Sequence, residues 1–243
     1  MRPLSAQQML AVWERGLDQI PLERALALLE AACPELDRES LARMSIGQRD
    51  DCLLRLREWA FGRQVSGCMS CQTCGQPLEA AFTTDSLRHN AGEPGPERVP
   101  LSIAGYDLMF RPVNSLDLAA CMGVPPSEVA RRLFLRCLVS ANTAGAEVSG
   151  EQVPAELAEP AMDDLTHADP QANLEIISVC GACGASVREC FDVVAFFWSE
   201  IDAWARRILR EVHLLASAYG WTETDVLSLS SIRRQFYLEM AGA

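Results

Sequence analysis

The sequence predicts an α+β protein that is mainly helical, with a small antiparallel β element joining two distant segments. Three observations lead to this fold class. Apolar residues recur at helical spacing through residues 1–63 and again through residues 193–243. A short cysteine motif followed by strand-like sequence occurs twice, near positions 71 and 180. Between the copies, residues 90–169 mix turn residues, hairpin-like sequence and further helical patterns.

The N-terminal region, residues 1–63, predicts helices with clear starting signals. Ser5 and Gln8 form a capping-box pattern, and Pro21 stands where a second helix would begin. Ser45 and Gln48 repeat the capping-box pattern before a further helix, which we expect to end near Gly62. On the buried face of that helix we expect Leu53, Leu56, Trp59 and Ala60.

The inserted region at 90–169 is the most varied part of the chain. Its first residues, 90–96, are rich in Gly and Pro and predict a loop, and residues 101–103 and 106–111 predict a hairpin turning at Ala104-Gly105. Helices are expected at about 115–122 and 127–139. The Ala-, Glu-, Gly- and Pro-rich stretch at 142–160 predicts a mobile surface loop.

The C-terminal region, residues 193–243, predicts one long helix followed by short ones. The long helix should run over about 193–218 and end at Gly220, and Ser230 or Ser231 should open a final helix. On the final helix, Arg233, Arg234 and Tyr237 are expected on accessible turns. The apolar seam of the long helix comprises Val194, Phe197, Ile201, Trp204, Ile208, Val212 and Leu215.

The two cysteine motifs share more than their thiols. They read Cys71-Gln-Thr-Cys74-Gly75 and Cys180-Gly-Ala-Cys183-Gly184. Counted from the first cysteine, position +7 is Leu78 or Val187, and position +11 is Phe82 or Phe191. Each copy therefore predicts a tight turn running into a strand, with Gly supplying the positive φ that the turn needs. Four thiols on two such turns suit a tetrahedral, structural Zn²⁺ ion.

A zinc site of this kind would be split, with segments 64–89 and 170–192 each supplying one hairpin. The 105 residues between Cys74 and Cys180 (75–179) make the closure cost about 4 kcal/mol plus a constant. Structural zinc contributes on the order of 10–16 kcal/mol, which outweighs that cost. Cys68 also stands at ligand spacing from Cys71, so it competes with the Cys71–Cys74 pair. Only the latter pair carries the glycine and strand register seen at Cys180.

The other five cysteines lie in apolar or helical surroundings, where we expect them to act as small core residues. They are Cys33, Cys52, Cys121, Cys137 and Cys190. A thiol-redox role for the paired cysteines is the weaker alternative. Redox CxxC motifs usually open a helix, whereas both copies here run into strand-like sequence.

Composition narrows the function classes. The formal net charge is −12, and this acidic balance disfavours broad binding to a phosphate backbone. The chain has no lysine, so all 21 of its Lys and Arg residues are arginine. No apolar run approaches the roughly 18 residues of a membrane span, and the N-terminus lacks a secretory pattern, which favours the cytosol. No phosphate loop, nucleophile elbow or metalloprotease helix occurs. We therefore expect a protein that is not an enzyme.

The C-terminal quarter carries the most recognisable segments. They are residues 191–201 (FDVVAFFWSEI), 211–216 (EVHLLA), 218–221 (AYGW) and 233–238 (RRQFYL). With the two cysteine motifs and residues 46–50 (IGQRD), they resemble a family encoded in the contractile-tail gene clusters of phages and phage-derived contractile injection systems. The family is similar to the baseplate-hub subunit and baseplate assembly factor of T-even phages. The resemblance is best over residues 45–85 and 170–240.

The resemblance implies a non-enzymatic protein that helps to build, or forms part of, the hub of a contractile-tail baseplate. Its partners would be other baseplate, hub or spike proteins, met in the bacterial cytosol during assembly. The aromatic pairs Phe196–Phe197 and Tyr219–Trp221 would either anchor such contacts or fill the protein's own core. The competing interpretation is a zinc-ribbon module that binds nucleic acid or serves transcription.

Overall fold

The computed structural model describes residues 1–88 and 95–242, so most of the loop predicted at 90–96 lies outside the described residues. Helices make up 56% of the chain and the strands form small antiparallel sheets, which confirms the predicted α+β, mainly helical class. The chain divides into two compact units, one formed by Met1–Leu36 with Val193–Ala243 and one by Asp37–Asp192. Within the described residues, no helix combines the length and apolar character needed to cross a membrane.

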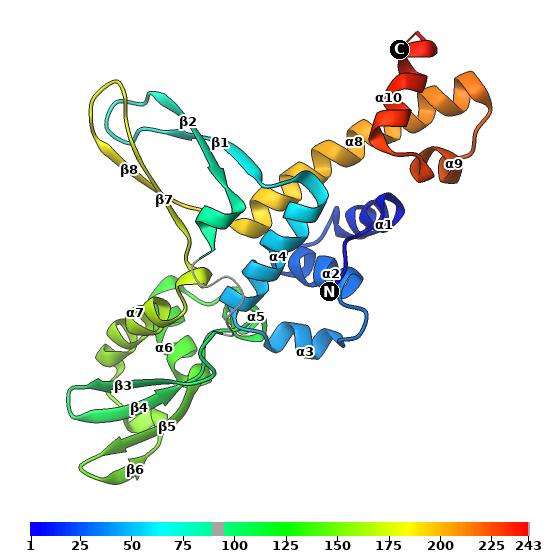
Figure 1. Cartoon of the computed structure of the whole chain (residues 1–243). Coiled ribbons are helices and arrows are strands. Elements are labelled where there is room, and N and C mark those ends of the chain that lie inside the picture. The colour runs from blue at the N-terminus through cyan, green and yellow to red at the C-terminus, as the bar shows by residue number, and fades with distance from the viewer. Residues whose placement is uncertain (89–94, 243) are drawn as a thin grey trace. The chain divides into compact units, whose positions relative to one another are not determined.

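The first unit is built on three helices, namely α1 (Ala6–Gly16), α2 (Pro21–Ala32) and α8 (Val193–Tyr219) (Figure 1). Ser5 accepts a hydrogen bond from the Gln8 backbone and Gln8 returns one, which confirms the predicted capping box. Pro21 occupies the start of α2 as predicted. The predicted seam of α8 is largely buried, and α1 and α2 both pack against this helix.

Trp198 on α8 organises this helical packing. A Cβ atom added at Gly16 would lie 2.2 Å from the Trp198 ring, so only glycine lets α1 approach that ring. The guanidinium of Arg24 lies 4.6 Å from the ring centroid on the α2 side. The indole of Trp198 therefore packs against both α1 and α2. A separate hydrogen bond joins α1 to α8, in which Trp13 Nε1 donates to Asp202 Oδ1 at 2.9 Å.

The C-terminal helices α9 (Glu223–Ser228) and α10 (Ser231–Met240) pack on the end of α8 (Figure 1). Gly220, at φ +69°, ends α8, and Ser230 caps α10, as predicted. Arg234 was expected on an accessible turn but is buried. It donates to Glu211 Oε2 at 2.9 Å and to the Leu229 carbonyl at 2.6 Å, so an internal ion pair holds it.

The second unit begins with α3 (Arg38–Arg43) and α4 (Ile46–Phe61). The Ser45–Gln48 capping box is present, and Gly62 at φ +87° ends α4. The expectation that Trp59 and Ala60 are buried is wrong, because both are exposed. Arg57 occupies the buried side of this last turn instead and donates from Nη1 to the Gly62 carbonyl at 2.7 Å.

A four-stranded antiparallel sheet has the order β3 (Val99–Ile103), β4 (Tyr106–Phe110), β5 (Leu138–Thr143) and β6 (Ala146–Val148). The predicted hairpin is β3–β4, with Ala104 and Gly105 both at positive φ. The expectation of a mobile surface loop at 142–160 is wrong. Ala144 and Gly145 also have positive φ and close the hairpin β5–β6, and the short helices η2 (Gly150–Gln152) and η3 (Ala155–Leu157) follow.

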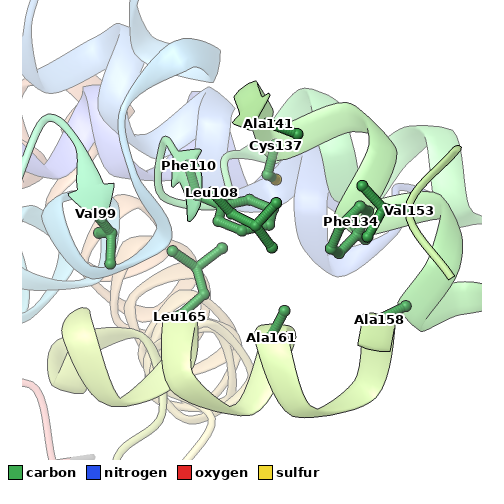
Figure 2. Packing of buried hydrophobic residues seen from close by; sticks show 10 residues of the cluster. All are labelled: Val99, Leu108, Phe110, Phe134, Cys137, Ala141, Val153, Ala158, Ala161 and Leu165. Atoms are coloured by element: carbon green, nitrogen blue, oxygen red, sulfur yellow. The ribbon is translucent and has the colours of Figure 1, made fainter. Parts of the chain in front are cut away.

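Helices α5 (Ser115–Cys121), α6 (Pro126–Cys137) and α7 (Ala158–Ala168) accompany this sheet. Figure 2 shows Leu165, Ala161 and Ala158 on one face of α7, directed toward the apolar residues of the strands and α6. Phe110 and Phe134 meet edge to face at 5.1 Å between ring centroids. The core thus extends into the segment expected to be a loop, since Ala158 is fully enclosed.

Two separate hairpins complete the second unit. They are β1 (Gln64–Ser70) with β2 (Pro77–Thr83), followed by η1 (Thr84–Leu87), and β7 (Glu175–Val179) with β8 (Ser186–Cys190), preceded by η4 (Pro170–Ala172). Each is antiparallel, and the turn of each carries one cysteine motif. Figure 1 shows the two hairpins side by side, with their turns at the same end.

Candidate metal centre

The first cysteine motif forms a tight turn between β1 and β2. The Gly75 N–H donates to the Cys71 carbonyl at 2.8 Å, and the Cys71 N–H donates to the Gln76 carbonyl at 2.9 Å. Gly75 has φ +73°, a conformation that residues with a Cβ rarely adopt. These bonds fold the turn so that Cys71 and Cys74 face the same side.

The second motif repeats this geometry. The Gly184 N–H donates to the Cys180 carbonyl at 2.8 Å, the Cys180 N–H donates to the Ala185 carbonyl at 2.9 Å, and Gly184 also has φ +73°. In each turn the first cysteine is buried and the second is exposed. The sequence repeat is therefore a structural repeat, residue for residue.

The two turns bring four thiols together. The Sγ atoms of Cys71, Cys74, Cys180 and Cys183 all lie within 4.8 Å of one another. Cys71 Sγ is 3.7 Å from Cys183 Sγ, and Cys74 Sγ is 3.7 Å from Cys180 Sγ. A disulfide would require about 2.05 Å. A tetrahedron of thiolates at about 2.3 Å from a zinc ion has edges of about 3.8 Å, which the observed pairs match.

The electrostatics of the cluster suit a cation. Backbone N–H groups of Cys74 and Thr73 lower the pKa of the Cys71 thiol to about 6. The backbone N–H of Gln76 also lowers the pKa of Cys74, but the neighbouring thiols and partial desolvation outweigh it and raise that pKa to about 12. Four thiolates this close repel one another. The full set of ligands therefore ionises only when a positive charge is bound between them.

Apolar contacts support the cluster on the side of the strands. Val187 is buried there and Leu78 is partly buried, so both +7 positions of the sequence repeat pack beside the thiols. The +11 residues, Phe82 and Phe191, meet edge to face with ring centroids 5.5 Å apart. The +7 residues thus pack beside the thiols, and the +11 residues join the two hairpins through a contact of their own. The repeat predicted both hairpins, and the structure shows that they pair.

The remaining cysteines stay outside this cluster. Cys68 lies on β1 opposite Glu79 and is exposed. Among the described residues, the thiol cluster contains Cys71 but not Cys68, so the alternative Cys68–Cys71 pair does not supply the ligands. Cys33 and Cys137 are buried, as expected of core residues. Cys190 is exposed on β8, so the expectation of core packing is wrong for this residue. Its place on a two-stranded hairpin leaves one face open to solvent.

A buried carboxylate in the second unit had no clear sequence signal. Asp117, with a fully enclosed side chain, accepts from Arg111 Nη1 at 2.6 Å and Arg111 Nη2 at 2.9 Å. It also accepts from Arg136 Nε at 2.9 Å. Burial opposes the charge, but these bonds and the Asn114 N–H lower the pKa of Asp117. The local sequence predicts only the capping box of Asn114 with Asp117. It does not predict the two ion pairs, because both arginines lie outside the helix that carries Asp117.

The segment 46–50 has a structural explanation at the start of α4. The Gly47 N–H donates to Asp169 Oδ2 at 3.1 Å, and an added Cβ at Gly47 would lie 1.9 Å from Asp169 Oδ1. The neighbouring Arg49 and Asp50 form a buried ion pair at 2.7 Å. This motif therefore docks η4, just before β7, onto α4.

Comparison with known protein families identifies a match for most of the chain. A family model described as T4 bacteriophage base plate protein matches residues 8–198, which is more than half of the chain and includes all four clustered cysteines. No curated protein and no solved structure matches the chain. Both cysteine motifs, the segment 46–50 and the start of α8 fall inside the matched region. The chain belongs to the T4 bacteriophage base plate protein family.

Proposed function

We propose that Cys71, Cys74, Cys180 and Cys183 hold a structural Zn²⁺ ion. Four sulfur donors at tetrahedral spacing favour zinc over Mg²⁺ or Ca²⁺, which prefer oxygen ligands. All four ligands come from protein, so the ion would have no open position for a substrate. Its role would be to join two hairpins that are remote in the sequence.

We infer that the protein is a non-enzymatic assembly factor or hub component of a contractile-tail baseplate. The observation that carries this proposal is the family match over residues 8–198. The thiol centre supports it, because a closed four-ligand site stabilises a scaffold rather than activating a substrate. The partners would be other baseplate, hub or spike proteins of the same tail.

Co-expression with those tail proteins tests this proposal. A stable complex should appear on gel filtration, with this protein and at least one tail protein co-eluting at constant ratio. Elution of the protein alone from every such mixture would refute the role. Mass spectrometry of purified particles then distinguishes a hub component from an assembly factor, since a hub component remains in the particle and an assembly factor leaves it.

The metal is tested separately on the freshly purified protein. We expect one zinc per chain by elemental analysis, and protection of the four cysteines from alkylation until a chelator is added. Rapid alkylation of Cys71 or Cys180 without a chelator would favour a redox pair instead. Because this assay needs no partner, it can fail while the baseplate role stands.

A further inference from the structure

A groove in the first unit lies between the turn that joins α1 to α2 and the first half of α8. Its volume is about 420 Å³, which falls in the range of roughly 300–1,000 Å³ that is usual for binding pockets. Its lining includes four apolar side chains, namely Leu17, Pro21, Val194 and Trp198. We call this surface the α8 groove. All the residues that line it belong to the first unit.

Leu17 is the most exposed part of this apolar lining. It stands four residues after Trp13, which is buried, and therefore continues the buried face of α1. Leu17 itself is 43% exposed, because it borders the groove. A partner that covers Leu17 would bury apolar surface that folding leaves in water.

The charges of the α8 groove are positive on balance. Two guanidinium groups, Arg24 and Arg206, line it together with one carboxylate, Asp202. Arg206 Nε donates to Asp202 Oδ2 at 2.8 Å. This bond, the hydrogen bond from Trp13 and the charge of Arg24 all lower the pKa of Asp202, so the carboxylate interacts with both cations. Two cations and one anion leave one positive charge over, in a chain whose formal net charge is −12.

Arg24 is held in place by groups that do not neutralise it. Its Nε donates to the Gly16 carbonyl at 2.9 Å and its Nη2 to the Leu17 carbonyl at 3.0 Å. The guanidinium also lies 4.6 Å from the centroid of the Trp198 ring. These contacts fix the side chain, so little conformational entropy is lost when it binds an anion. The two N–H groups of Nη1 are not used in these bonds and can donate to a carboxylate.

An occupant that suits the α8 groove brings both a negative charge and apolar groups. A phosphate group carries about two negative charges at neutral pH, and Asp202 would repel it. It would also leave Leu17 and Trp198 uncovered. A single carboxylate matches the one surplus positive charge. An aspartate or glutamate next to a bulky apolar side chain therefore meets both requirements.

We propose that the α8 groove binds a segment of a partner protein in which a carboxylate side chain stands beside bulky apolar side chains. The carboxylate pairs with Arg24, and an apolar side chain packs against Leu17 and Trp198. The choice of a protein as the occupant rests on the proposed baseplate role. The chemistry of the segment rests on the groove itself.

A capped tetrapeptide of sequence Asp-Leu-Phe-Asp is the probe, and Asn-Leu-Phe-Asn is its neutral control. Each is titrated into the ¹⁵N-labelled full chain, and the backbone amide signals of Leu17 and Ser199, which both line the groove, are followed by NMR. The groove is much smaller than a standard interface, so we expect a dissociation constant of roughly 0.1–1 mM for the acidic peptide. The neutral peptide should bind about fivefold more weakly, and salt should reduce this difference.

Two leucines of similar exposure separate the groove from the rest of the surface. Leu17→Glu places a carboxylate in the groove and should weaken binding of the acidic peptide by about tenfold. The matched control is Leu36→Glu, because Leu36 is 39% exposed in the same unit and does not line the groove. Far-UV circular dichroism and thermal melting check that both variants keep the wild-type fold.

Two neighbouring arginines test the charge in the same way. The Arg206 and Arg207 side chains are 62% and 68% exposed, and each forms an ion pair with a carboxylate four residues away. Only Arg206 lines the groove. Arg206→Gln removes the surplus positive charge and should weaken binding of the acidic peptide by about threefold, whereas Arg207→Gln should leave it unchanged.

Several outcomes would overturn this proposal. They are no shift of the groove signals up to about 5 mM acidic peptide, equal binding of the neutral peptide, and binding that is indifferent to Leu17→Glu. Self-association of the wild type that Leu17→Glu abolishes would assign the groove to a second copy instead.

Co-elution with tail proteins then tests whether the baseplate partner uses this surface. Leu17→Glu should lose a tail protein that Leu36→Glu retains on gel filtration. A complex that survives Leu17→Glu would place the partner elsewhere and refute this use of the groove. If the wild type co-elutes with no tail protein, the baseplate role fails, while the peptide titration still decides on the groove by itself.

Discussion

Replacing Cys183 with serine removes one ligand of the proposed zinc site and tests whether the metal is structural. A structural zinc ion contributes on the order of 10–16 kcal/mol. Closing the 105-residue loop between Cys74 and Cys180 (75–179) costs about 4 kcal/mol. The difference, about 6–12 kcal/mol, is comparable to the whole free energy of unfolding of a typical domain, about 5–15 kcal/mol.

A site that loses one of its four thiolates keeps only part of this contribution. If Cys183→Ser lowers the free energy of unfolding by about 4 kcal/mol, the melting temperature of a protein of this size falls by roughly 10 °C. The assay combines thermal unfolding followed by circular dichroism with elemental analysis of the same sample. We expect the variant to lose zinc and stability together.

Cys68→Ser is the matched control, since it makes the same chemical change three residues before Cys71. Cys68 is exposed and lies outside the thiol cluster. Its substitution should leave the zinc content and the melting temperature at their wild-type values. Equal melting temperatures for the wild type and both variants would refute a structural metal. A full zinc content in Cys183→Ser would refute the assigned set of ligands.

Three further substitutions test the packing and the electrostatics of the fold. Gly16→Ala should lower the free energy of unfolding by about 1–3 kcal/mol in urea titrations, because the new methyl group meets the Trp198 ring. Asp117→Ala should lower it by about 2–3 kcal/mol, since it leaves two half-exposed arginines without their shared carboxylate. Burial raises the pKa of Asp50 to about 6, so folding favours its protonated form. The stability of wild type relative to Asp50→Asn, measured by urea unfolding across pH, should therefore fall from about pH 4 to 6 and then level off.

Features specified within a few residues were predictable from the sequence. The capping boxes at Ser5 and Ser45 depend on residues three apart, so their patterns identify the helix starts directly. The positive-φ glycines of the two cysteine motifs likewise predicted the turns, and Gly220 predicted the end of α8. The identical spacing of the two motifs indicated that both would hold thiols in one geometry.

Features that depend on residues brought together by folding were not predictable. The local sequence around Arg234 predicts an exposed side chain, but Glu211 of α8 lies opposite Arg234 and forms an internal ion pair with it. Ala158 belongs to a segment of loop-like composition, but the sheet and α6 enclose it. Trp59 has the right helical spacing for burial, yet no part of the chain that the structure describes covers the last turn of α4 on that side. In each case the neighbouring element, not the local sequence, decides the exposure.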